Sequence, residues 1–142
     1  MHIFSNYIIL ISAVAWIVAV IIKGIYGLKR GTFSVSQTLG SGGMPSVHSA
    51  LVTSATTAVG IKYGVFSDLF ALALIFSMII IYDAINVRFE AGLHAQALNS
   101  LRKRKDGEEE IYKFNESIGH LPSEAFAGSV IGIIVAMILM NL

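Results

Sequence analysis

The sequence predicts an all-α integral membrane protein, a compact bundle of about four transmembrane helices with one cytoplasmic amphipathic helix. Composition is the first reason, because 55% of the residues are hydrophobic and 13% are charged, whereas soluble domains carry about 25% charged residues. The mean hydropathy of +0.73 agrees with this class. Patterning is the second reason, because the apolar residues gather in runs suited to crossing hydrocarbon. The 142 residues fit a single membrane domain, 1–142.

Four apolar runs account for the predicted spanning helices. Residues 7–22 approach the roughly 20 residues that a span requires. Residues 49–61 are apolar but rich in Ser, Thr and Ala, a composition typical of a helix packed among other helices. Residues 69–82 form the third run, and residues 125–142 form the last. We therefore expect a multi-pass protein of the cell membrane.

The segment between the third and last spans is amphipathic and then charged. Residues 89–104 carry Ala and Leu at helical spacing, which predicts an amphipathic helix on the membrane surface. The basic run 102–105 ends this segment and is followed by acidic residues. The absence of cysteine excludes a disulfide framework and a thiolate nucleophile. The first apolar run lacks a basic start, so we expect no cleavable signal peptide.

Basic residues predict the orientation, because they concentrate on the cytoplasmic flanks of spans. Lys23, Lys29 and Arg30 follow the first span, and Arg88 with the run 102–105 follows the third. Both long loops are therefore expected in the cytoplasm, with both termini outside. This arrangement brings the polar residues that flank the spans to one membrane face. They are Lys23, Arg30, Ser46, His48, Asp83, Arg88, His120 and Glu124.

Residues 41–49 read Ser-Gly-Gly-Met-Pro-Ser-Val-His-Ser and run directly into an apolar segment. Pro45 suits the first position of a helix, because its fixed φ fits and its missing N–H would be unpaired there. The free N–H groups and the dipole of a helix start attract anions. With the Ser46 hydroxyl and the His48 imidazole beside them, the stretch fits a phosphate. An ordinary loop-to-helix junction explains the same residues equally well.

A second polar group precedes the last span. His120 and Glu124 are four residues apart, and Pro122 between them suits a first helical position. A carboxylate that meets one imidazole nitrogen fixes the tautomer and leaves the other nitrogen free to react. A Glu at the third helical position is also a common capping choice, so the spacing is open to both interpretations.

Cations near both groups are candidates for binding phosphoryl oxygens. Lys23 and Arg30 lie seven residues apart, hence on one face if the first helix continues, and Arg88 would complete a cationic cradle. Attraction to lipid headgroups is the alternative, which we favour for Lys29 and the run 102–105. The two histidines suggest phosphoryl transfer, in which one attacks phosphorus and the other protonates the leaving oxygen. We expect no metal and no cofactor, because the acidic residues lack the clustering of a magnesium site.

These motifs resemble those of the type 2 phosphatidate phosphatase superfamily, which also includes the vanadium haloperoxidases. Residues 43–48 resemble its Pro-Ser-Gly-His motif, residues 120–124 resemble its His-x-x-x-Asp motif, and residues 128–132 its glycine-spaced helix. Lys23 and Arg30 resemble its Lys-x6-Arg-Pro motif. The chain looks most like the divergent branch of this superfamily, which consists of small bacterial membrane proteins.

The resemblance implies a role for each matching residue. His120 would be the nucleophile, Glu124 its orienting acid and His48 the general acid. The residues that would hold phosphate are Lys23, Arg30, Ser46 and Arg88. The chain departs from the family pattern at Gly31, Val47 and Glu124, where the family has proline, glycine and aspartate.

Two further departures concern spacing and size. The family interval of five residues leads from Arg88 to His94, but Leu98 then stands where the acid belongs, so His120 is preferred. Superfamily members usually have six spanning helices, whereas this chain has room for about four.

These observations support three hypotheses of function. The leading hypothesis is a membrane phosphatase that hydrolyses a lipid phosphate or pyrophosphate through a phosphohistidine intermediate. The alternative is a non-enzymatic lipid-phosphate binder or transporter that keeps the anion pocket. The third is a small assembly subunit, since the spacing of Gly128 and Gly132 permits close helix pairing and hence a homodimer. As partners we expect a lipid phosphate and membrane lipids, and no nucleic acid.

Overall fold

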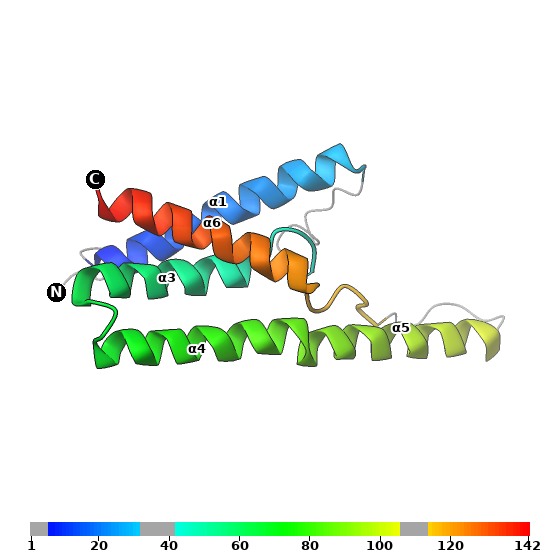
Figure 1. Ribbon diagram of the computed structural model, residues 1–142. Helices are drawn as coiled ribbons and strands as arrows, with labels where there is room; N and C mark the ends of the chain where they lie inside the picture. The colour runs from blue at the N-terminus through cyan, green and yellow to red at the C-terminus, as the bar shows by residue number, and fades with distance from the viewer. Residues whose placement is uncertain (1–5, 32–41, 106–113) are drawn as a thin grey trace.

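The computed structural model describes residues 6–31, 42–105 and 114–142, without the side chains of residues 102–105. In these ranges the chain is helical, and its helices form a bundle from which one helix projects (Figure 1). The bundle helices are α1 (Tyr7–Lys29), α3 (Val47–Tyr63), α4 (Asp68–Ile85) and α6 (Pro122–Met140). The predicted all-α class is confirmed.

Helix α1 extends further than its apolar run predicts. It begins after Asn6, whose side chain accepts the Ile8 N–H, and it continues past residue 22 to Lys29 with Arg30 as its C-cap. No proline interrupts residues 23–29, and the basic side chains there tolerate helix well. Lys23 therefore belongs to the helix interior and is buried, rather than marking its end.

Helix α3 lies at the centre and packs against α1, α4 and α6. Its Ala, Ser and Thr side chains let these neighbours approach closely. Thr56, for example, contacts Ser77 of α4 hydroxyl to hydroxyl at 2.6 Å. The prediction of a helix surrounded by other helices is confirmed. The predicted position of Pro45 is wrong, because Ser46 is the N-cap and Pro45 precedes it.

Helix α6 meets α3 through its two spaced glycines. A Cβ added at Gly128 would lie 2.1 Å from the Ser46 carbonyl oxygen, and one added at Gly132 would lie 2.3 Å from the Ala50 carbonyl oxygen. Only a residue without a side chain allows such backbone contact. The glycine stripe thus joins two helices of one chain, and α3 occupies the face that was considered for a second copy.

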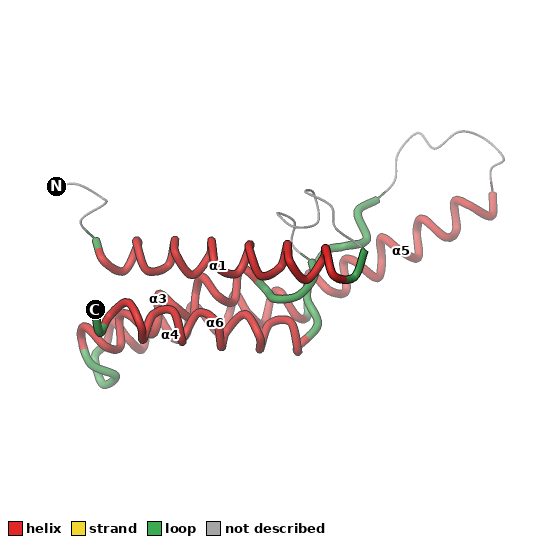
Figure 2. Tube along the Cα trace, turned by 90° about the horizontal axis from the view of Figure 1, so that it is seen from above, coloured by secondary structure: helices red, strands yellow, loops and turns green. Residues whose placement is uncertain are grey.

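Helix α5 (Val87–Lys105) covers the segment predicted as an amphipathic helix, and it follows α4 after the single residue Asn86. Its predicted position on the membrane surface stays a prediction. It extends beyond the end of the bundle in both views (Figures 1 and 2). The chain then returns along it, because the Asn99 side chain bonds both the N–H and the carbonyl of Phe114. Gly92 completes the contact, since an added Cβ would lie 2.6 Å from the Ile118 carbonyl oxygen.

Three helical stretches of the described chain are long and apolar enough to cross a membrane. They are Tyr7–Lys29, the stretch Asp68–Leu101 and Pro122–Met140. Helix α3, with 17 residues, is shorter and lies inside the group. The ends of α1 and α4 and the starts of α3 and α6 lie at one end of the bundle, opposite the start of α1 and the end of α6 (Figure 1). The polar residues that flank these helices therefore gather at that end.

Candidate functional site

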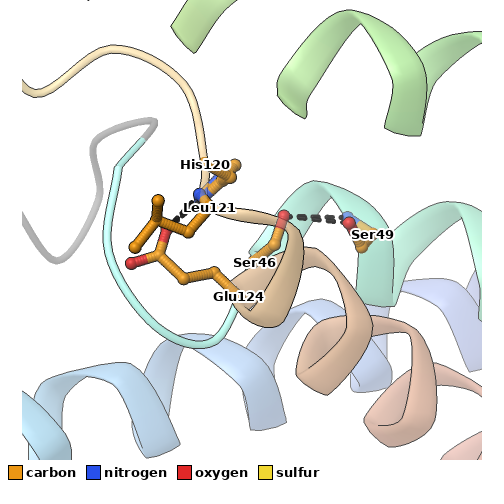
Figure 3. Close-up of polar contacts among 5 residues, drawn as sticks. All are labelled: Ser46, Ser49, His120, Leu121 and Glu124. Atoms are coloured by element: carbon orange, nitrogen blue, oxygen red, sulfur yellow. Dashed lines mark hydrogen bonds and ion pairs between the residues drawn. The ribbon is translucent and has the colours of Figure 1, made fainter. Parts of the chain in front are cut away.

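The start of α3 forms one side of the polar end. Ser46 is fully buried and caps the helix, accepting the Ser49 N–H at 3.3 Å and the Ser49 hydroxyl at 3.0 Å (Figure 3). His48 lies in the first turn and is exposed. The capping serine fixes where the helix begins, and this in turn fixes the position of His48.

The start of α6 forms the other side. Pro122 occupies its first turn, as predicted, and Glu124 occupies the third position. One carboxylate oxygen of Glu124 accepts the Leu121 N–H at 3.1 Å and also contacts His120 Nδ1 at 3.1 Å (Figure 3). The same oxygen therefore caps the helix and contacts the histidine, so the capping interpretation is confirmed, and the role of Glu124 in catalysis stays a prediction.

Backbone contacts join these two helix starts. The Ser46 N–H donates to the Glu124 carbonyl at 3.0 Å, and the His120 N–H donates to the Ala84 carbonyl of α4 at 2.9 Å. Gly119 has φ +90°, and a Cβ there would lie 2.3 Å from the Phe89 nitrogen. Only glycine suits both this conformation and this close approach. His120 is thus fixed by hydrogen bonds on its main chain and on its side chain.

The rings of His48 and His120 lie close together, with centroids 6.1 Å apart and planes inclined at 59°. The two rings differ in their surroundings, because His120 is only 2% exposed whereas His48 is open to the outside. Nε2 of His120 is buried and has no hydrogen-bond partner among the described residues. A buried polar nitrogen without a partner is costly, so in a native protein such a group is paired by a water or a ligand, or has a chemical role.

Charged side chains surround the two rings. Lys23 is 6% exposed and lies close enough to Glu124 and to His48 for their charges to interact. The Lys23 Cε atom also lies 3.4 Å from where a Cβ of Gly43 would be. Arg88, about half exposed, pairs with Asp83 and is likewise near enough to act on His48.

Most of the residues predicted for the site are brought together. His48, His120, Glu124, Ser46, Lys23 and Arg88 lie at one end of the bundle and contact or act electrostatically on one another. Arg30 is different, because its guanidinium lies over the ring of Tyr26, 4.8 Å from the centroid. His94, the alternative nucleophile, is exposed on α5.

Sequence reasoning missed two contributors. The Ala84 carbonyl holds the main chain of His120, and no side-chain pattern identifies a backbone acceptor. Ser49 bonds Ser46, and its position one residue after His48 was the only available signal. Within the described residues, no group of three or more His, Asp or Glu side chains is arranged to hold a metal ion.

Comparison with known proteins identifies the family of the chain. A family model described as the divergent PAP2 family matches residues 4–135, which is nearly the whole chain. The chain belongs to the divergent PAP2 family. It is also 35% identical to the uncharacterized membrane protein YuiD of Bacillus subtilis, over 98% of this chain and 97% of that protein. No solved structure matches significantly.

Membership of the divergent PAP2 family confirms the resemblance read from the motifs. The chain is accordingly a multi-pass membrane protein of a phosphatase-related family. Since the YuiD match extends over nearly the full length of both chains, the two proteins share the small size as well as the sequence.

Proposed function

We propose that this protein is a metal-independent membrane phosphatase that releases phosphate from a lipid phosphate or pyrophosphate. The observation that supports it best is the unpartnered Nε2 of His120, buried beside the ring of His48 and backed by Glu124 on Nδ1. An ionised carboxylate can only accept a hydrogen bond, so Nδ1 carries the proton. Nε2 then presents a lone pair, which is the state a nucleophile requires.

The chemistry divides between the two histidines. Nε2 of His120 attacks phosphorus, the N–P bond forms and the bond to the leaving oxygen breaks while protonated His48 gives that oxygen its proton. Water then attacks phosphorus and transfers a proton to His48, and the N–P bond breaks to release inorganic phosphate. Lys23 and Arg88 supply positive charge near the phosphoryl oxygens, where negative charge develops.

The separation of the rings sets a condition on this mechanism. An attack distance of about 3 Å and a proton-transfer distance of about 3 Å, with the P–O bond between them, separate the two ring nitrogens by about 7 Å. The ring centroids are 6.1 Å apart. His48 is exposed and can rotate outward to admit the phosphoryl group, whereas His120 is held by Glu124 and stays in place.

The test is phosphate release by the purified protein in mixed micelles with a phosphatidate or a prenyl pyrophosphate. Release is expected from the wild type and from His94→Ala, a matched control in which an exposed histidine is removed. His120→Ala is expected to release none. With isotopically labelled substrate, acid-labile phosphate should remain on the wild type and be absent from His120→Ala.

Three results would contradict the proposal. Normal release by His120→Ala would exclude this nucleophile. Binding of the lipid phosphate without release by the wild type would favour the alternative function, a lipid-phosphate binder or transporter. Matching loss in His94→Ala and His120→Ala would point to a general effect of removing histidine rather than to the site.

We also propose that the site faces the cytoplasm, because the basic residues concentrate at this end. The native chain has no cysteine, so single cysteines report topology directly. Ser100→Cys on α5 should react with an impermeant maleimide only after the membrane is permeabilised. Phe66→Cys, in the fully exposed turn at the opposite end, should react without permeabilisation. The reverse pattern would put the site outside.

A further inference from the structure

Ser49 stands in the first turn of α3, where the residue four positions earlier, Pro45, lies outside the helix, and it uses its hydroxyl differently from three described residues further inside their helices. Ser12, Thr57 and Ser129 each donate to the carbonyl oxygen four residues earlier, which is the ordinary bond for a hydroxyl inside a helix. Ser49 instead donates to the side-chain oxygen of Ser46, at 3.0 Å. Capping alone does not require this bond, because the Ser49 backbone N–H already donates to the same oxygen.

The double contact determines the direction of the Ser46 proton. A hydroxyl oxygen has two lone pairs and one hydrogen. Ser49 occupies both lone pairs of Ser46 Oγ, one through its N–H and one through its O–H. The Ser46 hydroxyl can therefore act only as a donor, and within the described chain no acceptor for its proton is found.

The proton of the Ser46 hydroxyl requires an acceptor. The Ser46 N–H is bonded to the Glu124 carbonyl, so Ser46 adjoins the turn that holds His120 (Figure 3). There the buried Nε2 of His120 also lacks a partner. The Ser46 hydroxyl can only donate, and Nε2 of His120 lacks a partner in the described part of the chain, and both groups are buried at the same end of the bundle. Together they suit a phosphoryl group whose oxygen accepts from Ser46 while its phosphorus faces His120.

We infer that Ser49 is a positioning residue, which orients the Ser46 hydroxyl toward a phosphoryl oxygen. This inference rests on the proposed function and adds a residue to it. A donor fixed before the reaction stabilises the charge of the transition state without reorganisation at that moment. In Ser49→Ala one lone pair of Ser46 becomes free, the hydroxyl can turn away, and this preorganisation is lost while the backbone cap remains.

The experiment measures the binding of orthovanadate to the protein. The five-coordinate form of this anion resembles the transition state of phosphoryl transfer. Its dissociation constant for the purified protein in micelles should rise about tenfold in Ser49→Ala. Ser129→Ala is the matched control, since it removes an ordinary helical hydroxyl bond, and its constant should stay within about twofold. Where the wild type turns over, kcat should fall by the same factor with KM nearly unchanged.

A double-mutant cycle separates positioning from a merely structural role. Because Ser49 acts through Ser46, Ser49→Ala should have no further effect on vanadate binding in a Ser46→Ala background. An equal effect in both backgrounds, or an unchanged constant in Ser49→Ala alone, would overturn the inference. Equal weakening in Ser129→Ala would do the same.

The readout also distinguishes this inference from the proposed hydrolysis. If the wild type binds vanadate but releases no phosphate from any lipid phosphate, hydrolysis fails while the role of Ser49 in anion binding is still decided by the cycle. If the wild type does not bind vanadate, the inference on Ser49 is overturned, while hydrolysis is still decided by the release of phosphate.

Discussion

The starts of α3 and α6 meet at the same place, yet they hold their histidines in opposite ways. His120 precedes its helix, is 2% exposed and is fixed by Glu124 and by the Ala84 carbonyl. His48 lies in the first turn of its helix and is exposed. A nucleophile gains from rigidity because its lone pair must be aligned, whereas an acid must follow a leaving oxygen that moves. The difference between the two helix starts matches this division.

The largest expected effect separates the two histidines by leaving group. His120→Ala should lower release at least about 1,000-fold from both an alkyl lipid phosphate and p-nitrophenyl phosphate, because no bond to phosphorus can form. His48→Ala should lower phosphate release from the alkyl ester about 100-fold or more. It should cost less than about tenfold with p-nitrophenyl phosphate, whose leaving group departs without a proton. Equal losses on both substrates in both variants would remove the distinction.

The next effect concerns the support of His120. Glu124→Gln keeps an oxygen for the Leu121 N–H but removes the charge beside Nδ1, so kcat should fall about 100-fold. The helix cap survives, and the thermal midpoint should move by only a few degrees. Glu116→Gln, which alters a carboxylate bonded to Asn99, is the control and should keep full activity. Wild-type rates in Glu124→Gln would mean that capping is its sole role.

The contact between the two helix starts is tested by Gly128→Ala. The added methyl group meets the Ser46 carbonyl, so the free energy of unfolding should fall by about 2 kcal/mol. Unfolding in mixed micelles with increasing denaturing detergent measures it. Val130→Ala, on the exposed side of the same helix, should change it by less than about 0.5 kcal/mol. Tolerance of alanine at 128 would show that α3 and α6 lie further apart.

The smallest effect is expected on the open side of the site. Asp83→Asn removes the partner of Arg88, and both side chains are partly exposed, so the pair contributes at most about 1 kcal/mol. We expect KM for the lipid phosphate to change by less than about fivefold and kcat to stay nearly constant. A loss as large as that of Glu124→Gln would mean that the open side is as strictly ordered as the buried one.

Much of the helical framework follows from the sequence, because four apolar runs and the Ser- and Thr-rich composition of the second one determine which segments are helical and which is central. The helix ends were harder to predict. Residues 23–29 continue α1 although they are less apolar, since tertiary contacts outweigh a change in hydropathy. Pro45 lies outside α3 because Ser46 is the better N-cap, and the two residue preferences compete at neighbouring positions.

The grouping of the site residues was predictable from the way spans alternate across a membrane. The detailed contacts were not. Gly128 and Gly132 have the same spacing whether they meet a helix of the same chain or of a second copy, so only the structure identifies α3 as their partner. Arg30 lies at the expected end of α1, but its side chain lies over the ring of Tyr26, four residues earlier. Its proposed contact with phosphate stays a prediction.

The interior of this bundle is made of small side chains, among them Ala19, Ala50, Ala58 and Ala136, while most of its bulky apolar side chains point outward. In a water-soluble domain the large apolar side chains fill the core, where changes in their volume are costly. In this bundle the arrangement is reversed. A Leu on the outer surface can be replaced by Ile or Phe with little consequence, whereas a larger side chain in place of a central alanine would not fit. Relatives that diverge widely should therefore differ first in the residues that touch lipid, and the acyl chains around them complete the packing that a soluble protein provides for itself.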